Sequence, residues 1–276
     1  MNETKRIWLC ADDYGISPAV SAAIRDLIAR RRINATSVMV GTPSFSPSEA
    51  QALADAAAAQ AAIGLHVTLT GPFRPLCPDF TPLHDGAFPM LAGMAGRALA
   101  RRLDPAALAS EIAHQFAAFR AAFGRPPDYV DGHQHIHVFP QIRDALIGVV
   151  KAAAPQAWIR QCGRSDAAPK RFADPKGFIL DALSARFERL ASRNGLRTNP
   201  AFAGTYSFQA GAVFEDLFPG FLDGLPDGGL IMCHPGKVDD ELRRLDPLTD
   251  LREREYAYFL DERFPELLAG RGYALA

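Results

Sequence analysis

Residues 7–40 read IWLCADDYGISPAVSAAIRDLIARRRINATSVMV, and this stretch contains a strand, a helix and a second strand in succession. The apolar run 7–11 is typical of a buried strand. Ser17 supplies an N-cap in front of a proline, and the apolar spacing over 19–32 predicts a helix. Residues 35–40 are strand-like again. A helix between two short apolar strands is the unit from which parallel sheets are built, so this stretch predicts an α/β fold.

The same alternation continues along the rest of the chain, and only 70–89 and 196–211 are expected to be irregular. No linker or change of composition divides the chain. We therefore expect one domain over 1–276, with parallel strands wound into one sheet or barrel. Further strands are expected at 63–69, 129–130, 158–160 and 230–233, and further helices at 47–60, 105–123, 142–154, 176–194 and 248–268.

Composition and charge exclude several classes of protein. Hydrophobic residues make up 48% of the 276 residues and charged residues 22%, which is typical of a folded chain. Thirty Lys and Arg against 31 Asp and Glu leave no basic excess for a phosphate backbone, so no nucleic-acid partner is expected. No apolar run is long enough to span a membrane or to form a signal peptide, and the four cysteines are scattered. We expect a cytoplasmic protein with reduced thiols, and the sequence leaves a homo-oligomer open.

Polar side chains suited to chemistry gather where the expected strands end. In parallel α/β folds the loops at the carboxyl ends of the strands converge on one face, where ligands bind. We therefore expect these side chains to form one site. They are Asp12 and Asp13 after the first strand, His66 in the third, Asp131, His133, His135 and His137 after the fourth, Arg160 after the fifth, and His234 after the last.

The adjacent carboxylates Asp12 and Asp13 repel each other unless a cation or hydrogen-bond donors compensate them. One interpretation is a turn and helix cap, since Asp-Tyr-Gly leads into the Ser17 helix. With imidazoles on the same face, the favoured interpretation is one carboxylate on a metal and its neighbour as a general base.

The segment Asp131-Gly-His-Gln-His-Ile-His137 is the most unusual string in the sequence. On an extended chain, alternate side chains point to one side, so the three histidines should face together. One strand easily supplies two metal ligands, which leaves a third ring to face the substrate or to support the others. Taken by itself, His66 is more typical of a buried core residue. His234 lies at a strand end, where its ring could act as a general acid.

Four segments carry most of the expected site residues, and they are CADDYG at 10–15, GLHV at 64–67, DGHQHIHVFP at 131–140 and IMCHP at 231–235. Together they resemble the YdjC-like carbohydrate deacetylases, a family with a chitooligosaccharide branch (ChbG) and a hopanoid-biosynthesis branch (HpnK). The order and spacing agree from residue 6 to about 275. Residues 196–208, LRTNPAFAGTYSF, resemble the hopanoid branch more closely.

The resemblance implies an irregular, polysaccharide-deacetylase-like (β/α) barrel that binds one divalent cation, with Mg²⁺ and Zn²⁺ both left open. By motif position, the ligands implied are Asp13, His66 and His133. Asp12 is then the general base and His234 the general acid. The remaining candidates contact substrate or support these residues, and they are Arg160, His135, His137 and Tyr206; Arg160 either holds Asp12 ionised or forms a structural salt bridge.

The activity expected is hydrolysis of the N-acetyl group of an N-acetylglucosaminyl substrate, and a lipid-linked hopanoid glycoside fits the closer branch. The alternatives are a chitooligosaccharide deacetylase, another metal-dependent amidohydrolase, and a carbohydrate- or lipid-binding protein without turnover. Aromatic rings pack well on sugar rings and flat apolar skeletons. We therefore expect two aromatic segments to flank the metal site and leave peripheral membrane contact open; their rings are Phe73, Phe80 and Phe88, and Phe202, Tyr206 and Phe208.

Overall fold

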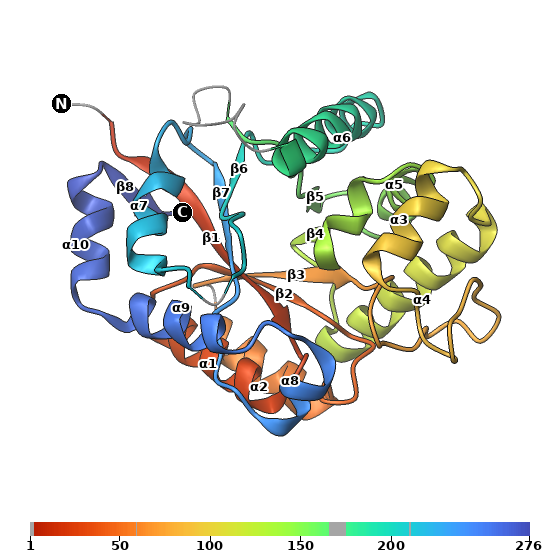
Figure 1. Ribbon diagram of the computed structural model, residues 1–276, viewed down its shortest axis with the longest axis horizontal. Helices are drawn as coiled ribbons and strands as arrows, with labels where there is room; N and C mark the ends of the chain where they lie inside the picture. The colour runs from red at the N-terminus through yellow and green to blue at the C-terminus, as the bar shows by residue number, and fades with distance from the viewer. Residues whose placement is uncertain (1–2, 59, 166–174, 210) are drawn as a thin grey trace.

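A computed structural model describes residues 3–58, 60–165, 175–209 and 211–276, and its centre is a curled parallel sheet with helices around the outside (Figure 1). All the strand pairs are parallel. The strands are β1 (Lys5–Tyr14), β2 (Ala35–Val38), β3 (Ala62–Val67), β4 (Tyr129–Gly132), β5 (Trp158–Ile159), β6 (Phe202–Ala203), β7 (Leu230–Cys233) and β8 (Tyr273–Leu275).

The order of the strands across the sheet is β5-β4-β3-β2-β1-β7-β6, with β8 paired to the start of β1. The outer strands β5 and β6 approach each other through irregular backbone. Ile159 N–H donates to the Arg197 carbonyl at 2.9 Å, and Phe202 N–H donates to the Gly163 carbonyl at 2.9 Å. The sheet therefore curls into an irregular barrel, as expected. The strand β1 lies between β2 and β7, and its residues 7–14 are buried except for the half-buried Trp8, because helices cover a parallel sheet.

Several helices begin where the sequence places capping residues. Ser17 accepts from Val20 N–H, Ser46 from Glu49 N–H, and Asp104 from Ala106 N–H. Each of these helices starts with a proline, which has no N–H to leave unpaired. The helices are α1 (Pro18–Ala29), α2 (Pro47–Ala57), α3 (Leu91–Leu99), α4 (Pro105–Phe123), α5 (Ile142–Ala153), α6 (Pro175–Arg193), α7 (Phe214–Leu222), α8 (Asp240–Leu245), α9 (Asp250–Leu260) and α10 (Arg263–Gly270).

The long elements agree with the sequence prediction, and the short ones were missed. The single helix expected at 248–268 is two helices, because Asp261 and Glu262 interrupt it between α9 and α10. The elements α3, α7, α8, β6 and β8 were not predicted, since short segments take their conformation from their neighbours rather than from their own propensity. Among the described helices, none combines the length and the apolar character that crossing a bilayer requires.

Candidate active site

A bulge at the end of β1 brings the carboxylates of Asp12 and Asp13 into one site. Neighbouring residues of a regular strand point to opposite faces of the sheet. The register of β1 against β2 shifts between Ala11 and Tyr14, and Asp13 has a φ of 68°. A bulge of this kind changes the direction of a side chain. Both carboxylates are buried at the carboxyl end of the sheet, where the sequence predicted the site.

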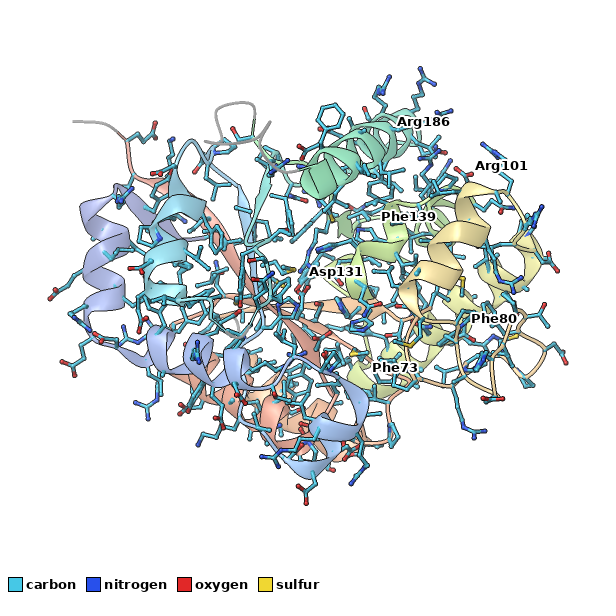
Figure 2. The ribbon with its side chains drawn as sticks, viewed as in Figure 1. Phe73, Phe80, Arg101, Asp131, Phe139 and Arg186 are labelled. Carbon is cyan, nitrogen blue, oxygen red and sulfur yellow. The ribbon has the colours of Figure 1, made fainter. Side chains whose placement is uncertain are left out.

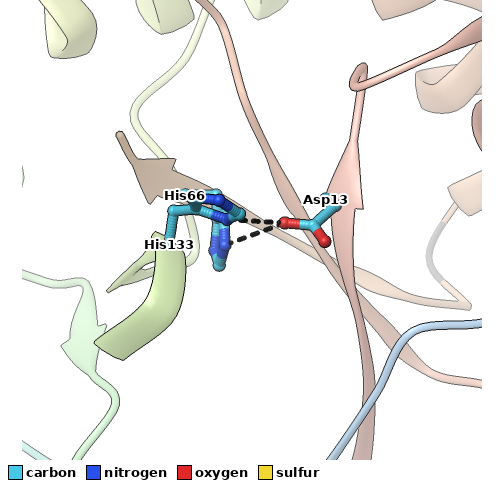
Figure 3. Close-up of side chains that lie close together, drawn as sticks. All are labelled: Asp13, His66 and His133. Carbon is cyan, nitrogen blue, oxygen red and sulfur yellow. Dashed lines mark hydrogen bonds and ion pairs between the residues drawn. The ribbon is translucent and has the colours of Figure 1, made fainter. Parts of the chain in front are cut away.

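Asp13, His66 and His133 converge from β1, β3 and the turn after β4 (Figure 3). Asp13 Oδ1 lies 3.3 Å from His66 Nε2 and 3.0 Å from His133 Nδ1. One ligand atom from each residue lies within 4.8 Å of the other two. A carboxylate oxygen and two imidazole nitrogens are a donor set that divalent transition metals accept. The three residues named as ligands by motif position therefore meet, and their chemistry fits a divalent cation.

Asp131 orients His66 from behind. Its Oδ1 lies 2.6 Å from His66 Nδ1, so the other ring nitrogen faces Asp13. Burial alone lowers the pKa of His66, but the charges of Asp131 and Asp12 and the hydrogen bonds that His66 donates to Asp13 and Asp131 outweigh it and raise the pKa to about 10. A carboxylate that fixes the far nitrogen of a ligand histidine is a common support of metal sites. The sequence placed Asp131 at the strand end but did not give it this role.

Arg252 supports Asp13 and was missed by the sequence analysis. Its Nη2 lies 2.6 Å from Asp13 Oδ2 and 2.8 Å from Asp246 Oδ2. Burial raises the pKa of Asp13, yet Arg252 and His133 outweigh it and hold that pKa well below its usual range. Oδ2 is thereby occupied, and Oδ1 is left facing the two histidines. No pattern in α9 distinguishes Arg252 from an ordinary surface arginine.

Arg160 holds Asp12 through both carboxylate oxygens, at 2.7 Å and 2.6 Å. Its Nη2 also lies 2.6 Å from Asp131 Oδ2, an ion pair without hydrogen-bond geometry, and 2.9 Å from Cys10 Sγ. Burial raises the pKa of Asp12, but Arg160 outweighs it and keeps this pKa well below its usual range. Cys10, Asp12 and Asp131 could form a metal-ligand cluster, but the guanidinium already takes the place of a cation there. The contact is compatible with both interpretations of Arg160, as the group that keeps Asp12 ionised and as a partner in a structural salt bridge.

The histidines of the 131–137 segment do not face together, and that expectation is wrong. His133–Val138 forms a 3₁₀ turn in which Gln134 and His135 have φ near 55°, so the chain is not extended. His135 Nδ1 lies 3.6 Å from Cys162 Sγ, and His137 Nε2 lies 2.8 Å from the Arg160 carbonyl. Burial lowers the pKa of both rings to about 3, which leaves them neutral. Of the three, only His133 reaches Asp13.

Behind His234, Tyr206 and Glu255 form a buried pair. The Tyr206 hydroxyl donates to Glu255 Oε1 at 2.6 Å, and the His234 backbone N–H donates to Oε2 at 2.5 Å. Burial raises the pKa of Glu255 to about 7, although these two donors and Arg252 oppose the rise. Burial also lowers the pKa of the His234 ring, whose Nδ1 has no hydrogen-bond partner among the described residues. Glu255 was not a predicted site residue.

The two aromatic segments reach the site only in part. Phe73 presents its ring edge-on to His133 at 5.7 Å between centroids, and Phe208 does the same to His234 at 5.4 Å. Figure 2 shows Phe73 below Asp131 and Phe80 farther out. Phe80 and Phe88 are buried against each other at 5.2 Å, so they belong to the core and not to the pocket mouth. The free energy gained by burying their apolar rings places Phe80 and Phe88 in the core.

Comparison with known proteins identifies the family and the fold of this chain. The sequence profile of the YdjC-like protein family matches residues 6–270. The chain belongs to the YdjC-like family. A chitooligosaccharide deacetylase of Yersinia pestis (strain Pestoides F) is 32% identical to this YdjC-like chain over 278 residues, covering 96% of this chain and 94% of the relative. The chitooligosaccharide deacetylase of Yersinia pestis bv. Antiqua (strain Angola) is 33% identical, with the same coverage.

Solved structures share the fold of this YdjC-like chain. A protein of Enterococcus faecalis V583, whose name proposes cellobiose-phosphate cleavage, superposes with a TM-score of 0.77 at 21% identity and covers 99% of this chain and 97% of its own. A peptidoglycan N-acetylglucosamine deacetylase gives a TM-score of 0.52 at 11% identity, covering 100% of this chain and 86% of its own. The polysaccharide-deacetylase-like barrel expected from the sequence is confirmed.

Proposed function

We propose that this YdjC-like chain is a hydrolase, dependent on a divalent cation, that removes the N-acetyl group of an N-acetylglucosaminyl substrate with one catalytic domain over 1–276. The observation that carries the proposal is the convergence of Asp13, His66 and His133, with Asp12 and His234 beside them. The curated relatives named chitooligosaccharide deacetylases support the same class of substrate.

Asp13, His66 and His133 would hold the cation. When bound, it would polarise the acetamide carbonyl and lower the pKa of a coordinated water. Two imidazoles and one carboxylate are closer to the donor sets of catalytic zinc than to the oxygen ligands that Mg²⁺ prefers. Asp131 and Arg252 would keep His66 and Asp13 in position whether or not the ion is present.

Asp12 is the residue we assign as general base. Arg160 keeps it ionised, so the carboxylate can accept a proton at neutral pH. Besides Arg160, Ser37 Oγ and Cys10 Sγ donate to Asp12 Oδ1, at 3.2 Å and 3.5 Å. Each carboxylate oxygen has about two lone-pair sites, so the remaining acceptor capacity for a water lies on Oδ2, which accepts only from Arg160 among the described residues. The same guanidinium reduces the basicity of Asp12. Arg160 therefore lowers the proton affinity of Asp12, but it also fixes the position of this carboxylate and keeps it negatively charged.

His234 is the residue we assign as general acid toward the departing amine. Because burial lowers its pKa, the ring is neutral in the resting protein. The proton that it donates has to be acquired during turnover. The Glu255 contact to its backbone N–H and the ring of Phe208 fix its position. His234→Ala should reduce amide hydrolysis far more than hydrolysis of an activated acetyl ester, and equal losses on both substrates would contradict the acid role.

For the substrate, we propose an N-acetylglucosamine carried on an apolar group, such as a hopanoid glycoside. Phe208 is 41% exposed, and its ring lies edge-on to His234. Exposed apolar side chains beside a polar site favour a ligand with both kinds of surface, and they fit peripheral contact with a membrane. The second candidate is a soluble chitooligosaccharide, which the names of the relatives favour.

The test is acetate release by the full chain loaded with Zn²⁺ or Mg²⁺, on soluble chitobiose and on a lipid-linked N-acetylglucosamine. Acetate from either sugar supports the deacetylase, and the faster of the two identifies the substrate. Release only from amides that carry no sugar would indicate another amidohydrolase. Sugar binding without acetate release under either metal would indicate a binding protein. His133→Ala serves as the metal-site control.

A further inference from the structure

Five arginines line a hollow of about 410 Å³ outside the candidate active site. The hollow lies between α5, α6 and the turn after α3, and Figure 2 shows Arg186 and Arg101 on this side of the molecule. The whole chain has a net charge of −1, so this concentration of positive charge is local. The lining residues are Arg101, Arg143, Arg186, Arg189 and Arg193, with Asp144 and Leu190.

Arg143 is the buried member of this arginine hollow. It is only 4% exposed, and its Nε and Nη1 have no hydrogen-bond partner among the described residues. Asp144 Oδ1 lies 3.6 Å from Nε, too far for a hydrogen bond, and Asp144 Oδ2 accepts from the Gln141 N–H at the start of α5. Burial lowers the pKa of Arg143, Asp144 opposes this, and Arg186 and Arg101 lower it further. Buried N–H groups without acceptors are costly, so Nε and Nη1 of Arg143 are open to an acceptor that the described residues do not supply.

The other arginines also lack compensating charge. Arg186, Arg189 and Arg193 are spaced three and four residues apart on α6, where like charges on one helix face repel. The dipole at the end of α6 favours Arg193 but not the other two. Among the described residues, no carboxylate lies within salt-bridge distance of any of these three or of Arg101. Arg189 Nε donates to the Ala185 carbonyl at 3.0 Å, but no opposite charge among the described residues offsets the repulsion between these arginines.

We propose that the arginine hollow is a binding site for a phosphate group, with Arg143 at its base. The planar guanidinium matches phosphate oxygens with two parallel hydrogen bonds, which an ammonium group cannot do. A dianion would supply the acceptors that Arg143 lacks and would offset the repulsion along α6. The group can be carried by a small phosphomonoester or by a lipid headgroup. None of the lining residues belongs to the candidate active site, so the site is independent of the proposed deacetylation.

The test is calorimetric titration of the full chain with inorganic phosphate and with glycerol 3-phosphate, at ionic strength held constant with KCl. Arg186→Gln/Arg189→Gln changes two exposed positions and should weaken phosphate binding at least about tenfold, the loss expected when charge-assisted hydrogen bonds are removed. Arg143→Met should weaken it similarly. The matched control, Arg30→Gln/Arg243→Gln, changes two exposed arginines, one directly after α1 and one on α8, and should bind as the wild type does.

Flotation with phosphatidylcholine vesicles, with and without phosphatidic acid, separates the two sources. Binding to the phosphatidic acid vesicles that Arg186→Gln/Arg189→Gln abolishes supports a lipid headgroup, and binding of the free phosphates alone supports a small phosphomonoester. His133→Ala should bind phosphate normally, which separates this site from the metal ligands. The proposal is overturned if no probe binds the wild type more tightly than Arg186→Gln/Arg189→Gln, if the control variant loses as much, or if His133→Ala abolishes the binding.

Discussion

Two groups of buried or crowded arginines in this molecule differ in how their charge is balanced. At the candidate active site, Arg160 and Arg252 are fully buried, and each contacts two carboxylates. In the arginine hollow, the buried Arg143 has one carboxylate at 3.6 Å, and its four companions have none within reach among the described residues. At the candidate active site, the carboxylates that compensate Arg160 and Arg252 also hold these side chains in position. Where such compensation is absent, the positive charge is open to a ligand, as we propose for the arginine hollow.

The largest effect is expected for Asp12→Asn, which keeps the shape of the active-site group but removes the proposed base. We expect the rate of deacetylation to fall by about 10²–10⁴-fold, the usual contribution of a general base. The metal content should not change, because Asp12 is not one of the three ligands. Acetate release and metal analysis of the same preparation measure both, and loss of metal would place Asp12 among the ligands instead.

Arg160→Met breaks the compensated region by leaving Asp12 and Asp131 buried without their cation. Removing one partner of a buried ion pair typically costs about 3–5 kcal/mol, and we expect a loss of unfolding free energy in this range. Denaturant unfolding measures it. Arg160→Met combined with Asp12→Asn should recover part of the loss, because fewer unpaired charges remain. A single variant as stable as the wild type would show that Arg160 is not needed for charge balance.

His133→Ala tests the metal ligands directly. We expect the affinity for Zn²⁺ to fall at least about tenfold, the scale seen even when residues that only support ligands are removed. Competition with a chromophoric chelator measures this affinity. His114→Ala, an exposed histidine on α4, is the matched control and should bind as the wild type does. Equal affinities of His133→Ala and the wild type would remove His133 from the site.

Glu255 should give the active-site region a measurable pH dependence. Its pKa is raised from 4.5 to about 7 in the folded chain, so the folded state holds a proton that the unfolded state has released between these values. Stability contributed by this group is therefore lost as the pH rises from about 4.5 to about 7. Glu255→Gln should flatten the slope of unfolding free energy in that window. Glu262→Gln, on the surface, should leave the slope unchanged.

The smallest effect is expected in the arginine hollow without ligand. Arg186→Gln/Arg189→Gln should change the unfolding free energy by less than about 0.5 kcal/mol or increase it slightly, because the two charges make no compensating contact. Denaturant unfolding in phosphate-free buffer measures this. A loss comparable to that of Arg160→Met would show that the charges stabilise the fold, and the contrast between the two regions would fail.

The sequence predicted which residues meet in the candidate site better than it predicted the orientation of their side chains. Asp13, His66 and His133 were expected at strand ends, and strand ends meet in any parallel barrel. The common orientation of the 131–137 histidines was expected from an extended chain, and the 3₁₀ turn after β4 overturned it. That turn is set by what packs around it. A Cβ at Gly132 would lie 2.9 Å from His137, a contact invisible in the sequence.

By itself, the sequence determined the order of the longer strands and helices, several capping positions and the kinds of ligand available, because these depend on local propensity and on the spacing of apolar residues. The tertiary structure decided which charges meet. Arg160 lies 148 residues from Asp12 and Arg252 lies 239 residues from Asp13 along the chain, yet each pair is in contact. The arginine hollow likewise combines residues from α5, α6 and the turn after α3. Such contacts depend on distances between segments, and only the packed sheet and its helices fix those distances.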